Sequence, residues 1–171
     1  MSPAIRSRAA RVNQYLLKTE EWFGVLLIVG FFVLLLIQVA MRYLMGSTYP
    51  WIVEVARLLF IWTTLIGAGF AVGRKSHITV TAISDALLKR RSHIATALGL
   101  LISLALGVLL AVASWELMET LGGVAASASG LSRGLFFLPG VIGFGLVALH
   151  SALLLLSGEY RESSADEGMA A

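Results

Sequence analysis

The sequence predicts an all-α integral membrane protein with four transmembrane helices. Its 171 residues are 58% hydrophobic and only 13% charged, and their mean hydropathy of +0.86 is well above that of an ordinary soluble domain of this length. Four apolar stretches each reach the length of about 20 residues that a helix needs to cross a bilayer. Since the chain has no cysteine, neither a disulfide nor a thiolate metal site can form.

The first predicted span covers residues 22–41 and follows a polar, basic arm at residues 1–21. Because the apolar region of a signal peptide is usually only about 7–15 residues long, this longer stretch indicates an uncleaved signal anchor. A short turn with Pro50 at its end leads to the second span, at residues 51–73. Helices one and two are therefore predicted to be antiparallel neighbours.

The segment that follows is polar and basic, and apolar residues recur within it at helical spacing from Ile78 to Leu87. This pattern predicts a short amphipathic helix on the membrane surface between helices two and three. The third span covers residues 94–121. A stripe of small residues along it predicts a face that another helix can approach closely. The stripe consists of Gly99, Ser103, Gly107 and Ala111.

A loop rich in small residues, 122–134, is predicted to be flexible. The fourth span covers residues 135–157, and a polar tail occupies residues 158–171. Lys and Arg are concentrated in the amino-terminal arm and in the segment between spans two and three, whereas the two opposite connections carry only Arg42 and Arg133. Both termini are therefore predicted to be cytoplasmic.

The second span carries an ionisable pair, Glu54 and Arg57. Charged side chains near lipid are costly unless they pair or face protein. Positions three apart share a helix face, so the two side chains are predicted to pair, with Arg42 as a second partner for Glu54. The pair either fixes helix packing or forms a substrate or proton site. An Arg partner keeps a carboxylate ionised, which favours the structural role.

No catalytic residue, metal site or cofactor is predicted. The sequence has no GxSxG, no GxxxxGK[ST] and no dinucleotide fingerprint. Its three histidines provide neither an HExxH motif nor a facing pair for haem within one span, and nothing resembles a nucleic-acid surface. His150 is predicted to be a buried hydrogen-bonding residue between helices.

Acidic residues near the end of the third span, Glu116 and Glu119, lie one helical turn apart beside Trp115. They are predicted to form a solvated rim or a docking point for a periplasmic partner, rather than a catalytic carboxylate pair. Arg133, in the next loop, is a further candidate for such docking.

The stretch from residue 51 to residue 80 resembles the signature of the small membrane subunit of tripartite ATP-independent periplasmic (TRAP) transporters, the DctQ-type or small-permease family. In that pattern a Trp precedes an acidic residue and an Arg, an apolar run with a second Trp and small residues follows, and a His precedes an aliphatic residue. These places are held here by Trp51, Glu54, Arg57, Trp62, Gly67, Ala68, His77 and Ile78.

The agreement extends to Arg42 at the end of the first span and to Pro139 in the fourth. The sequence also departs from the pattern. Members often have two adjacent acidic residues before the Arg, where this chain has Val53 and Glu54. This difference leaves one carboxylate to serve both arginines.

The resemblance implies a multi-pass protein of the bacterial inner membrane. Its expected partners are a large permease subunit and a periplasmic solute-binding protein, and the complex would use an ion gradient to take up an organic acid. The small subunit would extend the stationary scaffold of the large one. One alternative is an autonomous four-helix oligomeric transporter of the multidrug-exporter type that uses Glu54. A membrane-embedded haem or redox subunit is a third possibility, which the histidine count weakens.

Overall fold

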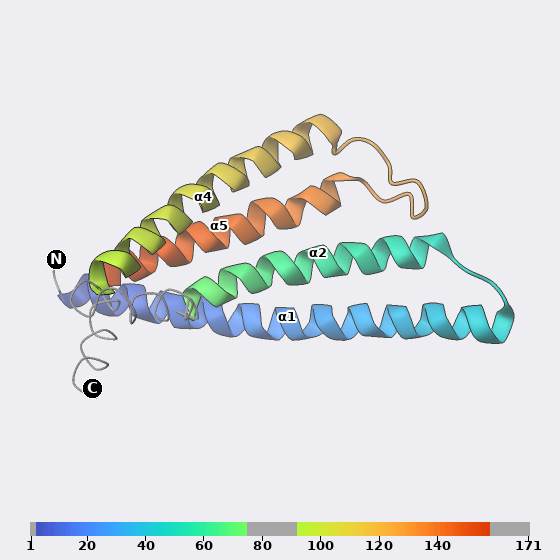
Figure 1. Ribbon diagram of the computed structural model, residues 1–171, viewed down its shortest axis with the longest axis horizontal. Helices are drawn as coiled ribbons and strands as arrows, with labels where there is room; N and C mark the ends of the chain where they lie inside the picture. Colours follow the sequence, from blue (N-terminus) through green and yellow to red (C-terminus); the bar gives the residue numbers. More distant parts are fainter. Residues whose placement is uncertain (1–2, 75–91, 158–171) are drawn as a thin grey trace.

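The structure is a computed structural model that describes residues 3–74 and 92–157. It consists of four long helices, α1 (Pro3–Met45), α2 (Pro50–Gly73), α4 (Ser92–Leu121) and α5 (Gly134–Ser157) (Figure 1). Each helix contains a stretch long and apolar enough to cross a membrane, which confirms the predicted all-α architecture with four candidate spans. The predicted interfacial helix, His77 and the tail at 158–171 lie outside the described residues.

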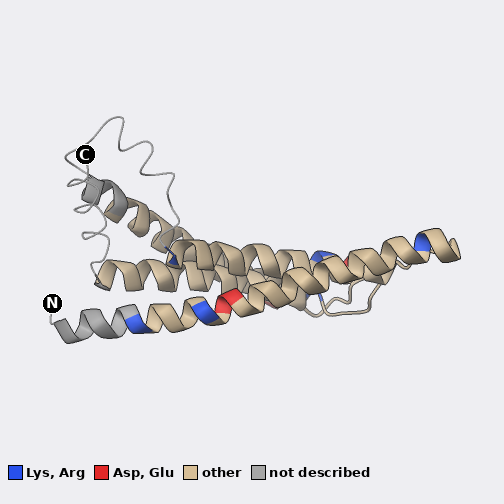
Figure 2. Ribbon diagram, turned by 90° about the horizontal axis from the view of Figure 1, so that it is seen from below, with Lys and Arg blue, Asp and Glu red and all other residues tan. Residues whose placement is uncertain are grey.

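Helix α1 is much longer than a membrane span requires. Its 43 residues correspond to about 65 Å of helix, whereas the hydrocarbon core of a bilayer is about 30 Å thick. Helix α1 begins at Pro3, so the described part of the amino-terminal arm continues the helix without a break. Charged residues of α1 gather toward its amino-terminal part, with Arg42 in the last turn (Figure 2).

Helix α5 is the central element of the bundle. It contacts α1, α2 and α4, and of the helices that the structure describes, α4 contacts α5 alone. Buried residues make up 39% of the most apolar window of α5 but only 6% of that of α1. Helices α1 and α2 lie side by side and antiparallel, as the short turn between them predicted (Figure 1).

Aromatic rings join α1 to α2. Phe23 meets Trp62 edge-on, with ring centroids 6.1 Å apart, and Phe31 meets Phe60 at 5.8 Å. Such pairs contribute about 0.5–1.5 kcal/mol beyond the area they bury. Contacts between apolar aromatic side chains, which suit a membrane interior, thus hold α1 and α2 together.

Glycine residues let the backbone of α5 approach those of α4 and α2 closely. A Cβ added at Gly107 of α4 would lie 2.9 Å from the backbone nitrogen of Ala148, and one added at Gly143 of α5 would lie 2.7 Å from Leu65 of α2. The predicted small-residue stripe therefore does pack at Gly107. At Gly99, by contrast, an added Cβ would meet nothing within 4 Å.

The connection between α4 and α5 is a folded hairpin. An antiparallel bridge pairs Ala125 with Ser132, and the N–H of Arg133 donates to the carbonyl of Val124 at 2.9 Å. Gly130 has φ +70° in the turn, a conformation that glycine adopts without steric cost. The structure thus differs from the predicted flexible loop, because backbone hydrogen bonds that composition does not reveal close it.

Candidate functional site

Glu54 lies in the second turn of α2, and its carboxylate binds the hairpin between α4 and α5. One carboxylate oxygen, Oε2, accepts hydrogen bonds from the N–H of Ser129 at 2.6 Å and from the N–H of Ala128 at 3.1 Å. Hydrogen bonds to an ionised acceptor are stronger than those between neutral groups. Glu54 therefore fastens the hairpin to the beginning of α2.

The arginines predicted as partners of Glu54 are placed differently. Within the described residues, no salt bridge joins Glu54 to Arg57 or to Arg42. Arg57 is exposed and acts on the carboxylate only through its charge, and Arg42 is exposed in the last turn of α1. The hairpin, through the amides of Ala128 and Ser129 and the side chain of Ser129, supplies the hydrogen-bond donors of this carboxylate.

The remaining motif residues occupy separate packing positions. Trp51 is partly exposed in the first turn of α2, and Trp62 packs against Phe23 of α1. Pro139 is fully buried inside α5. These three described side chains thus lie at different places in the bundle.

The predicted docking residues share the end of the bundle where α4 joins α5. Glu116, Glu119 and Arg133 are all exposed there. The indole N–H of Trp115 donates to Oε1 of Glu119 at 2.9 Å, which holds that carboxylate along the helix. The solvated rim and the docking of a partner on it both stay predictions.

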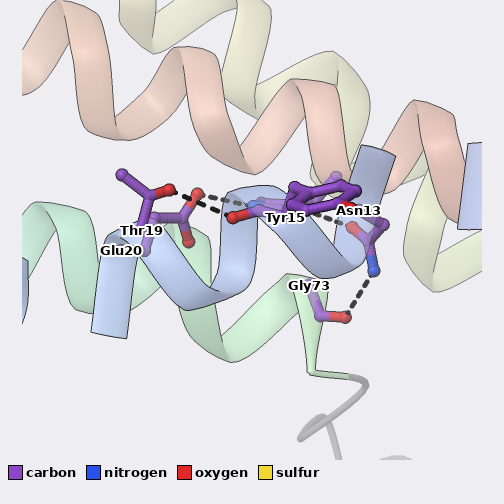
Figure 3. A network of polar contacts seen from close by, with 6 residues as sticks. Asn13, Tyr15, Thr19, Glu20 and Gly73 are labelled. Atoms are coloured by element: carbon purple, nitrogen blue, oxygen red, sulfur yellow. Dashed lines mark hydrogen bonds and ion pairs between the residues drawn. The ribbon is translucent and has the colours of Figure 1, made fainter. Parts of the chain in front are cut away.

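A buried polar cluster joins three helices at the other end of α2 (Figure 3). Nδ1 of His150 lies 2.6 Å from Oδ1 of Asn13, and Nε2 lies 2.7 Å from Oε1 of Glu20. Nδ2 of Asn13 donates to the backbone carbonyl of Gly73, the last residue of α2, at 3.2 Å. The prediction that His150 is a buried hydrogen-bonding residue between helices is confirmed.

The spacing of residues on α1 builds this cluster. Asn13 and Glu20 are seven residues apart, so a helix presents both on one face. Gly73 allows the imidazole to approach, because a Cβ there would lie 2.7 Å from Nδ1 of His150 and 2.8 Å from Leu17. Asn13 and Glu20 belong to the segment predicted to be a polar arm, and their role in this cluster was not predicted. The recurrence of Asn13, Leu17 and Glu20 at helical spacing was the available signal.

The cluster offers two potential metal ligands, Glu20 and His150. In the part of the chain that the structure describes, no group of three or more His, Cys, Asp or Glu residues comes together. The geometry is therefore that of a hydrogen-bonded link between helices.

Comparison with known proteins identifies the family. The family model described as "Tripartite ATP-independent periplasmic transporters, DctQ component" matches residues 16–159. The sialic acid TRAP transporter small permease protein SiaQ of Vibrio cholerae is 33% identical over 93 residues, 54% of this chain and 51% of that protein. The C4-dicarboxylate TRAP transporter small permease protein DctQ of the same species is 29% identical over 107 residues, 63% of this chain and 46% of that protein.

A longer protein also matches. The sialic acid TRAP transporter permease protein SiaT of Haemophilus influenzae is 31% identical over 72 residues, which are 42% of this chain but only 12% of SiaT. The matched stretches thus span about half of each small permease and a small part of SiaT. The family model, in contrast, covers most of α1 and the whole of α2, α4 and α5. The chain therefore belongs to the DctQ component family of the tripartite ATP-independent periplasmic transporters, a family of transporter components and not of enzymes.

Proposed function

We propose that this chain is the small accessory membrane subunit of a TRAP-type secondary transporter, in which it scaffolds a large permease subunit. The observation that carries this proposal is the family match, which covers most of α1 and the whole of α2, α4 and α5. In this role the complex takes up an organic acid with an ion gradient, and a periplasmic binding protein delivers the solute. The relatives named for sialic acid and C4-dicarboxylate transport support an acidic solute.

The relative SiaT supports a large permease as the partner. The 72 matched residues make up 12% of SiaT, so a segment similar to this chain is part of a much longer permease polypeptide there. Segments joined in one chain are held at high effective concentration, which suits elements that work side by side. By analogy, a separate large subunit lies beside this chain.

The uncovered apolar surface supports a membrane location and a scaffold role. Large apolar side chains of α1 face outward. The exposed fraction of the residue is 77% for Trp22 and 67% for Leu26. Helix α4 is similarly uncovered because α5 is its one described neighbour. Surfaces of this kind suit lipid on one side and the helices of a partner subunit on another.

For the location we infer a multi-pass protein of the bacterial inner membrane with both termini in the cytoplasm. The basic residues of the amino-terminal arm and of the segment before α4 support this orientation. Fusions of a green fluorescent protein to either terminus should fluoresce, and alkaline phosphatase inserted at the hairpin between α4 and α5 should be active. Active phosphatase at a terminus would contradict the orientation.

The hairpin end then faces the periplasm. Glu116, Glu119 and Arg133 are exposed there and are the candidates for contact with the periplasmic binding protein. Glu54 supports this role indirectly, because its hydrogen bonds hold the hairpin that carries Arg133. A carboxylate engaged in this way is poorly suited to the alternative role of Glu54 as the substrate or proton site of an autonomous exporter.

The test is affinity purification of the tagged chain from native membranes in mild detergent, followed by mass spectrometry of bound proteins. A large polytopic permease recovered in near-equal amount is the expected result. A chain that emerges alone, or as a homo-oligomer that binds solute, would instead support the autonomous transporter.

A further inference from the structure

The contact between Glu20 and His150 is sealed inside the bundle. His150 is fully buried and Glu20 is 7% exposed, and their atoms Oε1 and Nε2 are 2.7 Å apart. Buried polar atoms are satisfied by one another when water cannot reach them. The positions of the hydrogens in this contact must therefore follow from the neighbouring groups.

The carbonyl of Gly73 sets the direction of the hydrogen bonds. A carbonyl oxygen only accepts, so the amide NH₂ of Asn13 must face Gly73, at 3.2 Å. The amide oxygen of Asn13 is then the atom that faces His150, at 2.6 Å. Because this oxygen also only accepts, Nδ1 of His150 must carry a hydrogen.

The occupied Nδ1 restricts the other ring nitrogen. A neutral imidazole has a single N–H group. With a hydrogen on Nδ1, Nε2 therefore either carries only a lone pair, in the neutral ring, or carries the second hydrogen of an imidazolium. If Nε2 were bare and Glu20 ionised, two lone pairs would face each other at 2.7 Å. One proton between the two atoms replaces this repulsion with a hydrogen bond, whichever atom carries it.

We propose that Glu20 and His150 together form a buried binding site for one proton, held between Oε1 of Glu20 and Nε2 of His150. The proton belongs to the pair, as in other coupled sites. With it the pair is electrically neutral as a whole, either as carboxylic acid and imidazole or as carboxylate and imidazolium. The site is independent of the function proposed above.

The second oxygen of Glu20 supports a bound proton. Oε2 is buried and has no hydrogen-bond partner, and the same holds for Oγ of Ser151 next to His150. A net negative charge on a buried carboxylate with an unpartnered oxygen is costly. The proton removes that net charge without requiring a further partner.

The charged side chains next to Glu20 in the sequence are exposed and are not buried with the pair. On α1 these are Lys18 and Glu21. Helix α2 contributes the carbonyl of Gly73, and the guanidinium of the next residue, Arg74, lies over the Phe70 ring at 5.1 Å. Helix α4 has no charged side chain between residues 97 and 115, and α5 contributes His150 itself. Beside these described neighbours, the shared proton is what makes the pair neutral.

The shared proton completes a link between three helices. With the proton bound, the network joins α1, α2 and α5 through Asn13, Glu20, Gly73 and His150.

The direct test is nitrogen-15 NMR of the full-length chain in detergent micelles or nanodiscs, with labelled histidine rings. His150 is assigned as the signal that the single variants H77Q and H93Q leave in place. At pH 8 we expect a hydrogen on Nδ1 and a hydrogen-bonded proton shared at Nε2. An Nδ1 without a hydrogen, or an Nε2 without a shared proton, would overturn the proposal.

Discussion

The carboxylate of Glu54 holds the hairpin between α4 and α5 by two of its backbone amides. The pattern placed Arg57 one turn away, and the structure places two hairpin amides on the carboxylate instead. The reason is geometric, because the amides of Ala128 and Ser129 come from a segment about 75 residues further along the chain. Spacing within one helix cannot reveal such a contact.

The role of Glu54 predicts the behaviour of the hairpin. Glu54→Ala removes the shared acceptor, so the amides of Ala128 and Ser129 should exchange with deuterium about tenfold faster, as expected for loss of a single hydrogen bond. Glu54→Gln keeps an acceptor oxygen and should retain part of the protection. Hydrogen exchange followed by mass spectrometry or NMR measures the effect.

The matched control for this prediction is Glu116→Ala, since Glu116 is an exposed acidic residue at the same end of the bundle. It should leave the exchange of both amides unchanged. Equal exchange in the Glu54→Ala and unaltered chains would show that the hairpin is held by its internal bonds alone.

At the scale of helices, α5 holds the bundle together through close approach. Gly143 lies against the backbone of Leu65 in α2, where an added Cβ would be 2.7 Å from atoms that cannot turn aside. Gly145, two residues on, has nothing within 4 Å of an added Cβ. The same substitution should therefore have opposite outcomes at the two positions.

Gly143→Ala should lower the free energy of unfolding by roughly 1–3 kcal/mol, the usual cost of overpacking a tight contact. Gly145→Ala should leave it unchanged or raise it slightly, because alanine is the better helix former. Unfolding of the purified chain in mixed micelles measures both variants. An equal loss in both would mean that helix flexibility, and not the approach of α2, sets the effect.

The amino-terminal part of α1 is attached to the bundle by Asn13. Asn13→Ala removes the partner of the Gly73 carbonyl and that of Nδ1 of His150, and each buried polar atom left without a partner costs about 1–3 kcal/mol. The first turns of α1 should then detach more often, and trypsin should cut after Arg11 and Lys18 faster. Gln14→Ala, at the exposed neighbouring residue, is the control and should not change cleavage. Equal cleavage of both variants would contradict the attachment.

At the scale of the whole molecule, the exposed position of Arg57 suits contact with another subunit. A charged side chain in a membrane helix is stable only where it meets protein, water or headgroups. Arg57→Leu should therefore reduce the yield of the complex with the large permease and solute uptake in parallel, each by severalfold, while Arg57→Lys should preserve much of both. Pull-down and uptake assays on the same membranes measure the two effects. Normal assembly with lost uptake would point to a direct role in transport.

The sequence by itself determined the class of the protein, the number of candidate spans and the family. The length of an apolar stretch is a local property of the sequence. Stretches of about 20 apolar residues therefore predict membrane helices without any knowledge of how these helices pack. The motif around Trp51, Glu54 and Arg57 was likewise contiguous. His150, as a single polar residue in an apolar helix, could be recognised as a residue that needs a buried partner.

Only the tertiary structure decided what those polar residues contact. Asn13 and Glu20 meet His150 across about 130 residues of chain, and Glu54 meets the hairpin across about 75. These contacts depend on α5 lying between α1 and α2 on one side and α4 on the other, an arrangement that no local pattern encodes. In a membrane, where apolar surface is nearly uniform, the partners of the few buried polar groups are fixed by how the helices pack.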